Sequence, residues 1–412
     1  MPDTATFNRA AHVLRRVTED TPADAALRAE LAANRRLRPD ERRAVTRAVF
    51  AYYRWRQWLD PRESLQNQVA AAVGWQARFD QNPASIKSEA LAERVVPAWL
   101  REEMAISPEY LRQLQREPAL WLRTRTGQTD AVARGLGDCA PPALKVPGFE
   151  FRVSSLEPGT PIPKLGIRNP ELGTSFLATA LRYTGSRDLF RTEAFQTGRF
   201  EIQDLASQLV GHACAPQPGE TWWDACAGEG GKTLHLADLM RNKGLVWATD
   251  RSVRRLTLLQ RRAARAQVFN YRSAAWDGSV QLPTKTKFDG ILVDAPCSGV
   301  GTWQRNPHAR WTTTLDDVRE LAAIQRMLLE HVVPALKPGG RLLYSVCTLT
   351  RSETTAVAEA FTAAHPELEP SPVFVMTGIA TPGPASWSPA TIVLQPHELD
   401  ANGMFLAAWK RR

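Results

Sequence analysis

Hydrophobic and polar positions alternate in a regular strand-and-helix order from about residue 201 onward. Short apolar runs predict buried strands at 221–224, 245–250 and 288–293. Apolar residues at helical spacing, and one further apolar run, predict the elements between and after them: helices at 234–240, 253–266 and 321–336, and a strand at 341–344. Strands that alternate with helices indicate a parallel, doubly wound α/β sheet.

The N-terminal part has helical periodicity instead. Phe7, Ala11 and Leu14 share one helical face, and Asp40 is placed to cap a helix that carries apolar residues up to Tyr52. Residues 83–120 also show helical spacing, broken by prolines. This part is therefore predicted to be all-α.

Residues 121–200 differ from both neighbours. The runs Trp121–Thr126 and Phe149–Val153 alternate like strands, and prolines separate them. A small α+β module is expected here. The chain is too long for one ordinary core, and we predict three domains: a helical domain at 1–80, a helical linker with the α+β module at 81–200, and the doubly wound domain at 201–412.

The charge balance favours a polyanionic partner. The formal net charge is +9 and the pI is about 9.6, which is typical of nucleic-acid-binding proteins. The first 60 residues hold twelve arginines, no lysine and eight acidic residues. Arginine suits phosphate contact, although a solvated face with many ion pairs explains this density equally well.

No run of eighteen apolar residues predicts a membrane span, and the N-terminus lacks the apolar core of a secretory signal. The five cysteines form no Cys-x-x-Cys pair and their number is odd. This argues against a disulfide framework or a zinc site and for a reducing compartment. We expect a cytoplasmic protein, without a metal and monomeric.

Two cysteines follow predicted strands. Cys297 lies in Asp294-Ala-Pro-Cys297, and Cys347 lies in Tyr344-Ser-Val-Cys347. The carboxyl ends of parallel strands open into the ligand crevice, so two thiols and a carboxylate there suggest nucleophilic catalysis. The alternative is that both thiols are small buried hydrophobic groups.

A glycine-rich turn joins the first strand to its helix, in Asp224-Ala-Cys-Ala-Gly-Glu-Gly-Gly-Lys-Thr233. A phosphate loop would need glycine where Cys226 stands, and a dinucleotide fingerprint would need glycine at Thr233. Asp250 ends the second strand, where a carboxylate can accept both hydroxyls of an adenosine ribose. Asp277 is placed to face the adenine amino group. Together they fit an adenosine ligand without a triphosphate, of which S-adenosylmethionine (SAM) is the simplest.

These motifs, with Val293-Asp-Ala-Pro-Cys-Ser-Gly-Val-Gly-Thr302 and Tyr344-Ser-Val-Cys-Thr348, resemble the RsmB/Fmu (Sun) family of RNA cytosine-C5 methyltransferases. Arg305-Asn-Pro-His-Ala-Arg-Trp311 and Ile202-Gln-Asp-Leu-Ala-Ser207 support the resemblance, which covers about 199–412. Residues 1–60 are similar to the NusB-like RNA-binding domain of the bacterial members. The resemblance implies a Rossmann-like SAM-dependent methyltransferase domain.

The resemblance also implies residue roles. Cys347 is expected to be the nucleophile, Cys297 to release the product, Asp294 to contact the base, and Lys232 to position the cytosine or the cofactor. The expected SAM-binding residues are Cys226, Ala227, Gly228, Glu229, Gly230, Gly231, Lys232, Asp250, Asp277 and Asp294. Three positions depart from the family pattern: Glu229 replaces a proline, Val346 a threonine and His308 an aspartate.

The chemistry of the residues agrees with this resemblance. A thiolate adding to C6 of cytosine activates C5 for methylation, and a second thiol can assist release. We therefore predict SAM-dependent methylation of cytosine C5 in RNA, most simply 16S ribosomal RNA because the domain order resembles the bacterial 16S enzymes. The alternatives are transfer RNA as substrate, a ribosome-assembly factor without catalysis, and DNA methylation. DNA cytosine methyltransferases use the cysteine that corresponds to Cys297.

Overall fold

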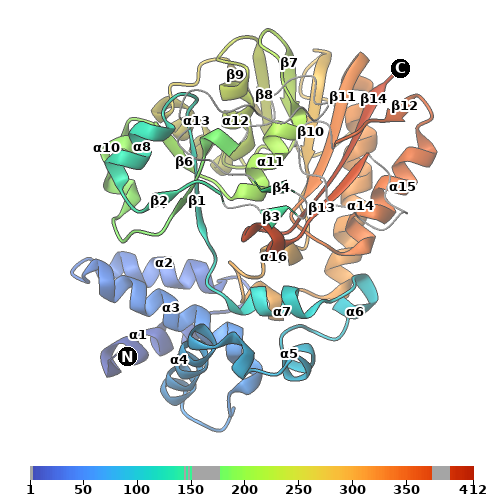
Figure 1. Ribbon diagram of the computed structural model, residues 1–412. Coiled ribbons are helices and arrows are strands. Elements are labelled where there is room, and N and C mark those ends of the chain that lie inside the picture. The colour runs from blue at the N-terminus through green and yellow to red at the C-terminus, as the bar shows by residue number, and fades with distance from the viewer. Residues whose placement is uncertain (1–2, 143–144, 147–148, 151–176, 374–389) are drawn as a thin grey trace. The chain divides into compact units, whose positions relative to one another are not determined.

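The computed structural model describes residues 3–142, 145–146, 149–150, 177–373 and 390–412 (Figure 1). The chain divides into two compact units. The first comprises Met1–Pro118 and Gly299–Val318, and the second comprises Ala119–Ser298 and Arg319–Arg412. The described part contains no helix that is both long enough and apolar enough to cross a membrane.

The first unit is helical, as the sequence predicts. Its helices are α1 (Thr4–Arg15), α2 (Ala23–Ala33), α3 (Pro39–Trp55), α4 (Leu65–Gln81), α5 (Ser88–Arg94), α6 (Leu100–Glu103) and α7 (Pro108–Gln115). Helices α1 to α4 bury one apolar cluster, which includes Val13, Leu27 and Val49. The prediction that Asp40 caps α3 is wrong. Arg38 is the N-cap residue, and its backbone N–H donates to the Glu41 carboxylate at 2.7 Å.

Residues 299–318 fold with these helices, although they lie far from them in the sequence. The Trp311 indole N–H donates to the carbonyl of Tyr53 at 2.7 Å. Arg310 is fully buried, and its guanidinium donates to the carbonyls of Leu114 and Val95 at 3.0 and 3.1 Å. The predicted boundaries at 80 and 200 stay a prediction. The compact units divide the chain elsewhere, because this segment packs on the N-terminal helices.

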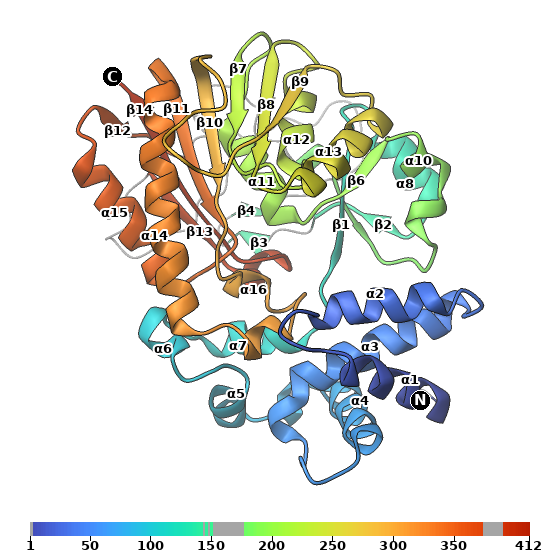
Figure 2. The ribbon, with the colours of Figure 1, turned by 180° about the vertical axis from the view of Figure 1, so that it is seen from behind.

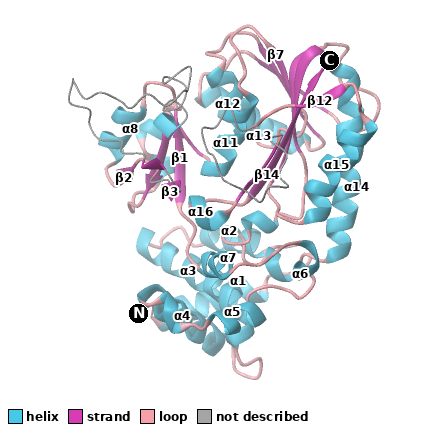
Figure 3. Cartoon of the chain, turned by 45° about the vertical axis from the view of Figure 1, so that its right-hand side comes forward, coloured by secondary structure: helices cyan, strands magenta, loops and turns pink. Residues whose placement is uncertain are grey.

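A small antiparallel sheet opens the second unit, in the order β2-β5-β1-β6. Its strands are β1 (Leu120–Thr124), β2 (Cys139–Ala140), β5 (Ala180–Tyr183) and β6 (Phe200–Ile202), with helices α8 (Thr129–Leu136) and α10 (Glu193–Gln196) beside them. The strand predicted at 121–126 is therefore present. Of the strand predicted at 149–153, only β4 (Phe149–Glu150), paired with β3 (Lys145–Val146), lies within the described residues. Figure 3 shows β1 and β2 apart from the large sheet.

The large sheet has the order β12-β14-β11-β10-β7-β8-β9, with β13 paired to β14. Its strands are β7 (Thr221–Asp224), β8 (Leu245–Asp250), β9 (Tyr271–Ala275), β10 (Phe288–Asp294), β11 (Leu336–Val346), β12 (Leu368–Pro370), β13 (Thr391–Leu394) and β14 (Met404–Arg411). The five strands β7 to β11 are parallel to one another, and β14 is antiparallel to β11. The predicted doubly wound sheet is confirmed.

Successive side chains of the central strands enter two different cores. Trp222 packs in one cluster with helices α11 (Leu205–Cys214) and α12 (Gly231–Leu239). Trp223 packs in the other, with α14 (Leu315–Val332) and α15 (Thr355–Ala364). Figure 2 shows α14 in front of β10 and β11. Because strand side chains alternate between faces, the near-continuous apolar runs in the sequence reflect burial on both faces.

Three elements have other bounds than predicted or were not predicted. The helix expected at 321–336 is α14, which begins at Leu315 and ends at Val332, and Leu336 already pairs with Phe288 as part of β11. Strand β9 was missed, because it alternates little and none of its five residues is fully buried. At the C-terminus, the short helix α16 (Pro396–Leu399) separates β13 from β14.

Candidate active site

The strand order reverses between β7 and β10. From β7 the chain proceeds to β8 and β9 on one side, and it then returns to β10 and β11 on the other. At such a reversal the loops that follow two adjacent strands diverge, which leaves a crevice at their carboxyl ends. The glycine-rich turn follows β7, and the Asp294 segment ends β10. Both predicted motifs therefore lie at the reversal.

The glycine-rich turn is held open by backbone geometry. Gly228 and Gly230 have φ of +54° and +85°, in the left-handed region that side chains disfavour. A Cβ on Gly230 would also collide with Leu259 of α13 (Val253–Arg265). The turn therefore exposes bare backbone at the start of α12, which suits close approach of a ligand.

Asp250 ties this turn to the end of β8. One carboxylate oxygen accepts from the backbone N–H of Gly228 at 2.9 Å, and the other accepts from the N–H of Ser252 at 2.8 Å. Arg255, whose side chain is half exposed, also reaches the first oxygen at 3.3 Å. Each carboxylate oxygen has two acceptor positions, so the second oxygen still has room for a ribose hydroxyl. The residues present therefore fit an adenosine ligand.

Asp224, the last residue of β7, stabilises the glycine-rich turn. It is completely buried, and one carboxylate oxygen accepts from the Thr233 hydroxyl at 2.7 Å. The other oxygen, Oδ1, has no hydrogen-bond partner among the described residues. Burial raises the pKa of Asp224 to about 7, although the Thr233 bond acts in the opposite direction.

Lys232 joins the glycine-rich turn to β10. Its ammonium lies 2.7 Å from one oxygen of Asp294, and the other oxygen accepts from the Ser345 hydroxyl at 2.7 Å. Burial alone would lower the pKa of Lys232, but the Asp294 carboxylate outweighs it and the pKa is raised. Lys232 is therefore an ammonium at neutral pH.

The two thiols meet at the same edge. The sulfur atoms of Cys297 and Cys347 are 3.3 Å apart, within hydrogen-bond distance for sulfur. The bond from Cys297 lowers the pKa of the Cys347 thiol. Burial and the Asp294 carboxylate act against this, and Lys232 assists it. Cys347 is thus the thiol that these neighbours favour as thiolate.

The remaining predicted residues have different surroundings. Cys226 and Ala227 lie in the turn after β7, and burial raises the pKa of the Cys226 thiol well above its usual range. Glu229 is exposed, and its carbonyl accepts from Arg262 at 3.1 Å. Asp277 is exposed in a turn after β9, where its carboxylate accepts from the N–H of Ser279. Within the described residues no hydrogen bond joins Asp277 to the glycine-rich turn.

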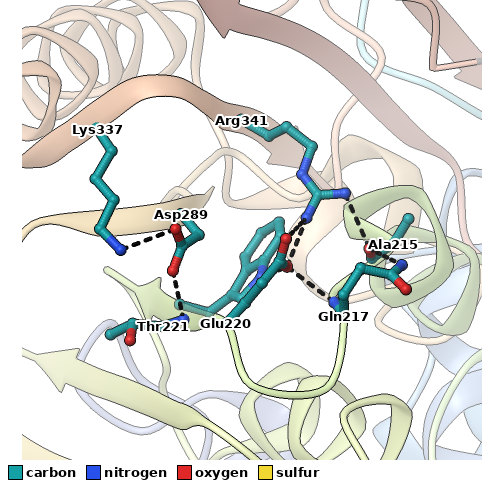
Figure 4. Close-up of polar contacts among 8 residues, drawn as sticks. Ala215, Gln217, Glu220, Thr221, Asp289, Lys337 and Arg341 are labelled. Carbon is teal, nitrogen blue, oxygen red and sulfur yellow. Dashed lines mark hydrogen bonds and ion pairs between the residues drawn. The ribbon is translucent and has the colours of Figure 1, made fainter.

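The amino ends of the strands also carry charged side chains, but these side chains bind one another (Figure 4). Arg341 binds the Glu220 carboxylate at 2.6 and 2.7 Å, and Lys337 binds Asp289 at 2.8 Å. Asp289 also accepts from the backbone N–H of Thr221, the first residue of β7. These contacts connect the amino ends of the strands, and the charged side chains drawn there are paired with one another.

Sequence reasoning missed several contacts of the site. Ser345 binds Asp294, and Arg255 binds Asp250. A buried glutamate, Glu353, binds the residues that follow both cysteines. Ser345 lies inside a quoted motif, so its position was a usable signal. For Glu353 the sequence offers no comparable signal, because its partners come from three separate segments.

Residues 212–410 match the family model described as 16S rRNA methyltransferase RsmB/F. The Bacillus subtilis (strain 168) protein named "Probable ribosomal RNA small subunit methyltransferase B" is 41% identical over 181 residues, which are 43% of this chain and 40% of that protein. The tRNA (cytosine(72)-C(5))-methyltransferase NSUN6 of Mus musculus is 39% identical over 165 residues, 37% of this chain and 34% of that protein. The chain thus spans well under two thirds of the length of these relatives.

Solved structures agree on the fold. The methyltransferase homolog protein of Pyrococcus horikoshii is 25% identical, with a TM-score of 0.58 over 74% of this chain and 90% of that chain. Another solved structure covers 100% of this chain and 99% of its own with a TM-score of 0.74, and its 22% identity makes it informative about the fold alone.

Proposed function

We propose that this chain, whose residues 212–410 match the RsmB/F methyltransferase family model, transfers a methyl group from SAM to C5 of a cytosine in RNA. The observation that carries the proposal is the pair of thiols 3.3 Å apart at the carboxyl edge of the sheet, beside the Lys232–Asp294 ion pair. Methyltransferases that act on oxygen or nitrogen have no comparable use for two thiols.

Cys347 is the proposed nucleophile. Cytosine C5 becomes nucleophilic when a thiolate adds to C6, and the neighbours of Cys347 lower the pKa of its thiol. After Cys347 has attacked, Cys297 would lose its own proton to solvent, and the resulting thiolate would take the C5 proton after methylation. This restores the double bond and expels Cys347 as a thiolate. The contact at 3.3 Å allows either sulfur to donate its proton to the other.

Asp294 and Lys232 would meet the cytosine ring. Addition at C6 pushes negative charge toward N3, and a positioned acid or ammonium stabilises that charge. Lys232 supplies the positive charge, while the Ser345 hydroxyl and Lys232 fix the orientation of Asp294. Both side chains are mostly buried, with 11% and 27% of their surface exposed, so the interaction with the ring is little screened by water.

The glycine-rich turn and Asp250 form the proposed cofactor site. SAM, when bound there, supplies the electrophilic methyl group. Asp250 would accept a ribose hydroxyl at its free acceptor position, and Gly228 and Gly230 would let the ligand approach the backbone. Cys226, Ala227, Glu229 and Gly231 belong to the same turn, and Asp277 is proposed to reach the adenine from its exposed turn.

The target base must leave its stack to reach such a crevice, and single-stranded RNA regions allow this most easily. We propose 16S ribosomal RNA as the substrate, in agreement with the description of the family. The NusB-like helical part of the chain is proposed to bind the RNA. Transfer RNA is the second candidate, because a tRNA methyltransferase is 39% identical over part of the chain.

Transfer of labelled methyl groups from SAM tests this proposal. We expect label in 16S RNA and, after digestion to nucleosides, in 5-methylcytidine. Label in transfer RNA alone would favour the second candidate. Label in DNA alone, or in a nucleoside other than 5-methylcytidine, would contradict the proposed reaction.

A further inference from the structure

One buried carboxylate connects the loops that follow the two cysteines. Glu353 has no exposed surface. Its Oε1 accepts from the backbone N–H of Ser298 at 2.8 Å, and its Oε2 accepts from the Ser298 hydroxyl. Oε2 also accepts from the hydroxyls of Thr348 and Thr350, at 3.1 and 2.7 Å. Ser298 directly follows Cys297, and Thr348 directly follows Cys347.

Helix α14 completes the connection. The Gln325 side-chain amide donates to Glu353 at 3.0 Å and to the carbonyl of Pro296 at 2.9 Å. Gln325 therefore holds the residue before Cys297, while Glu353 holds the residue after it. The Tyr344 hydroxyl lies 2.6 Å from the Glu353 carbonyl and 2.9 Å from the Gln325 side-chain oxygen. Both thiol-bearing loops thus share one buried polar network.

The network determines the geometry of the loops because its centre is costly to disrupt. A buried carboxylate is stable only when several donors point at it. Every donor that the structure gives Glu353 is neutral, and the donors come from segments 28 and 55 residues away as well as from its own turn. Movement of either loop would leave part of the charge without its hydrogen bonds. The loops, and with them the two sulfur atoms, are therefore fixed relative to each other.

We propose that Glu353 is a positioning residue that holds Cys297 and Cys347 at reacting distance. The inference deepens the proposed function and rests on it, because it assigns a separate group to the alignment of the two proposed reacting thiols. Glu353 acts through Ser298 and Thr348, the residues that directly follow the two cysteines.

Glu353→Gln is the main test variant. Its amide nitrogen can face the three hydroxyls, which can rotate to accept, so the side chain keeps its shape while the network weakens. We expect kcat for methyl transfer to fall about 100-fold, the usual effect of a small misplacement of reacting groups, with KM for SAM and the melting temperature nearly unchanged. Thr350→Val removes one donor and leaves the carboxylate, so it should give a smaller loss. Glu359→Gln makes the same chemical change at an exposed position of α15 and should behave like the unmodified protein.

A second measurement does not depend on methyl transfer. The pH dependence of Cys347 alkylation by iodoacetamide, followed by peptide mass spectrometry, reports how Cys297 stabilises the thiolate. Glu353→Gln should shift the midpoint upward, toward the value of about 8.5 for an ordinary thiol. Wild-type kcat and an unchanged midpoint would overturn the proposal, as would a loss of stability with an unchanged midpoint in the folded fraction. If the midpoint shifts but even the unmodified chain methylates no RNA, positioning of the thiols stands and the proposed function fails.

Discussion

At the residue scale, the thiol of Cys347 and the carboxyl of Asp224 have opposite surroundings at the same edge of the sheet. Cys347 has a hydrogen-bonding neighbour that lowers the pKa of its thiol. Asp224 is completely buried, and burial raises the pKa of its carboxyl to about 7. The first arrangement favours a reactive anion, whereas the second favours a protonated group that supports the glycine-rich turn through Thr233. Both groups lie at this edge, so their different surroundings indicate different roles and not different distances from the crevice.

The raised pKa of Asp224 predicts a pH dependence of stability. A carboxyl group that binds its proton more tightly when folded contributes stability at low pH, and it loses that contribution as the pH rises from about 4 to about 7. Asp224→Asn keeps the size of the side chain and cannot ionise. Over this pH range, the free energy of unfolding of the variant should fall by on the order of 1–4 kcal/mol less than that of the unmodified protein. Denaturant unfolding at several pH values measures this, and parallel pH profiles for both proteins would contradict it.

At the element scale, the apolar pattern predicted the central strands well. Strands β7 and β8 have the predicted bounds, because both are buried on two faces and end at turns rich in glycine or polar residues. Strand β9 lacks such a pattern, and Leu336 reads as the end of a helix in sequence although it pairs in β11. Local periodicity cannot reveal a pairing that depends on a distant strand.

The proposed cofactor site depends on the hydrogen bond that joins Asp250, at the end of β8, to the glycine-rich turn. Asp250→Ala should weaken SAM binding by about 1–3 kcal/mol, because a ribose hydroxyl and the Gly228 N–H would both lose their acceptor. Isothermal titration calorimetry measures the change, and Glu359→Ala, an exposed change on α15, is the control. Unchanged affinity in Asp250→Ala would remove Asp250 from the cofactor site.

The candidate site was predictable from sequence to the extent that its residues lie at strand ends. The glycine-rich turn, Asp250, Asp294 and the two cysteines follow apolar runs, and the sheet brings Asp294 beside Lys232. The Glu353 network was not predictable. Its hydrogen bonds join residues 28 and 55 positions apart, and nothing in the local pattern separates this glutamate from one on a solvated helix.

At the scale of the whole molecule, the arginine-rich N-terminal segment is more heavily paired than its composition suggests. Arg9 and Arg16 bind Glu30, and Arg28 binds Asp24. Arg54 is buried, with a pKa lowered to about 10 by burial. The ion-pair explanation therefore applies to part of the segment, and only the unpaired, exposed side chains remain candidates for phosphate contact.

Substitution of unpaired arginines tests the proposed RNA binding without disturbing the helical core. The side chains of Arg15, Arg35 and Arg36 are exposed and make no ion pair or hydrogen bond within the described residues. Changing all three to glutamine should lower the slope of log K against log salt by about 2, because each phosphate that is no longer bound lowers it by roughly 0.7. The matched control changes Arg28 and Arg38, which already pair with carboxylates. If the triple variant and the control variant have the same slope of log K against log salt, the segment is only a solvated surface.

The central claim is that Cys347 attacks the base and Cys297 releases the product. Trapping of the covalent intermediate tests it most directly. In the Cys297→Ala variant, Cys347 should add to cytosine C6 and C5 should accept the methyl group, but release should stall. A protein–RNA complex should therefore survive denaturing electrophoresis, and peptide mass spectrometry should find the RNA attached at Cys347. Cys347→Ala should give neither complex nor methylated RNA. A trapped complex in Cys347→Ala would reverse the two roles, and full activity in both variants would contradict cysteine catalysis altogether.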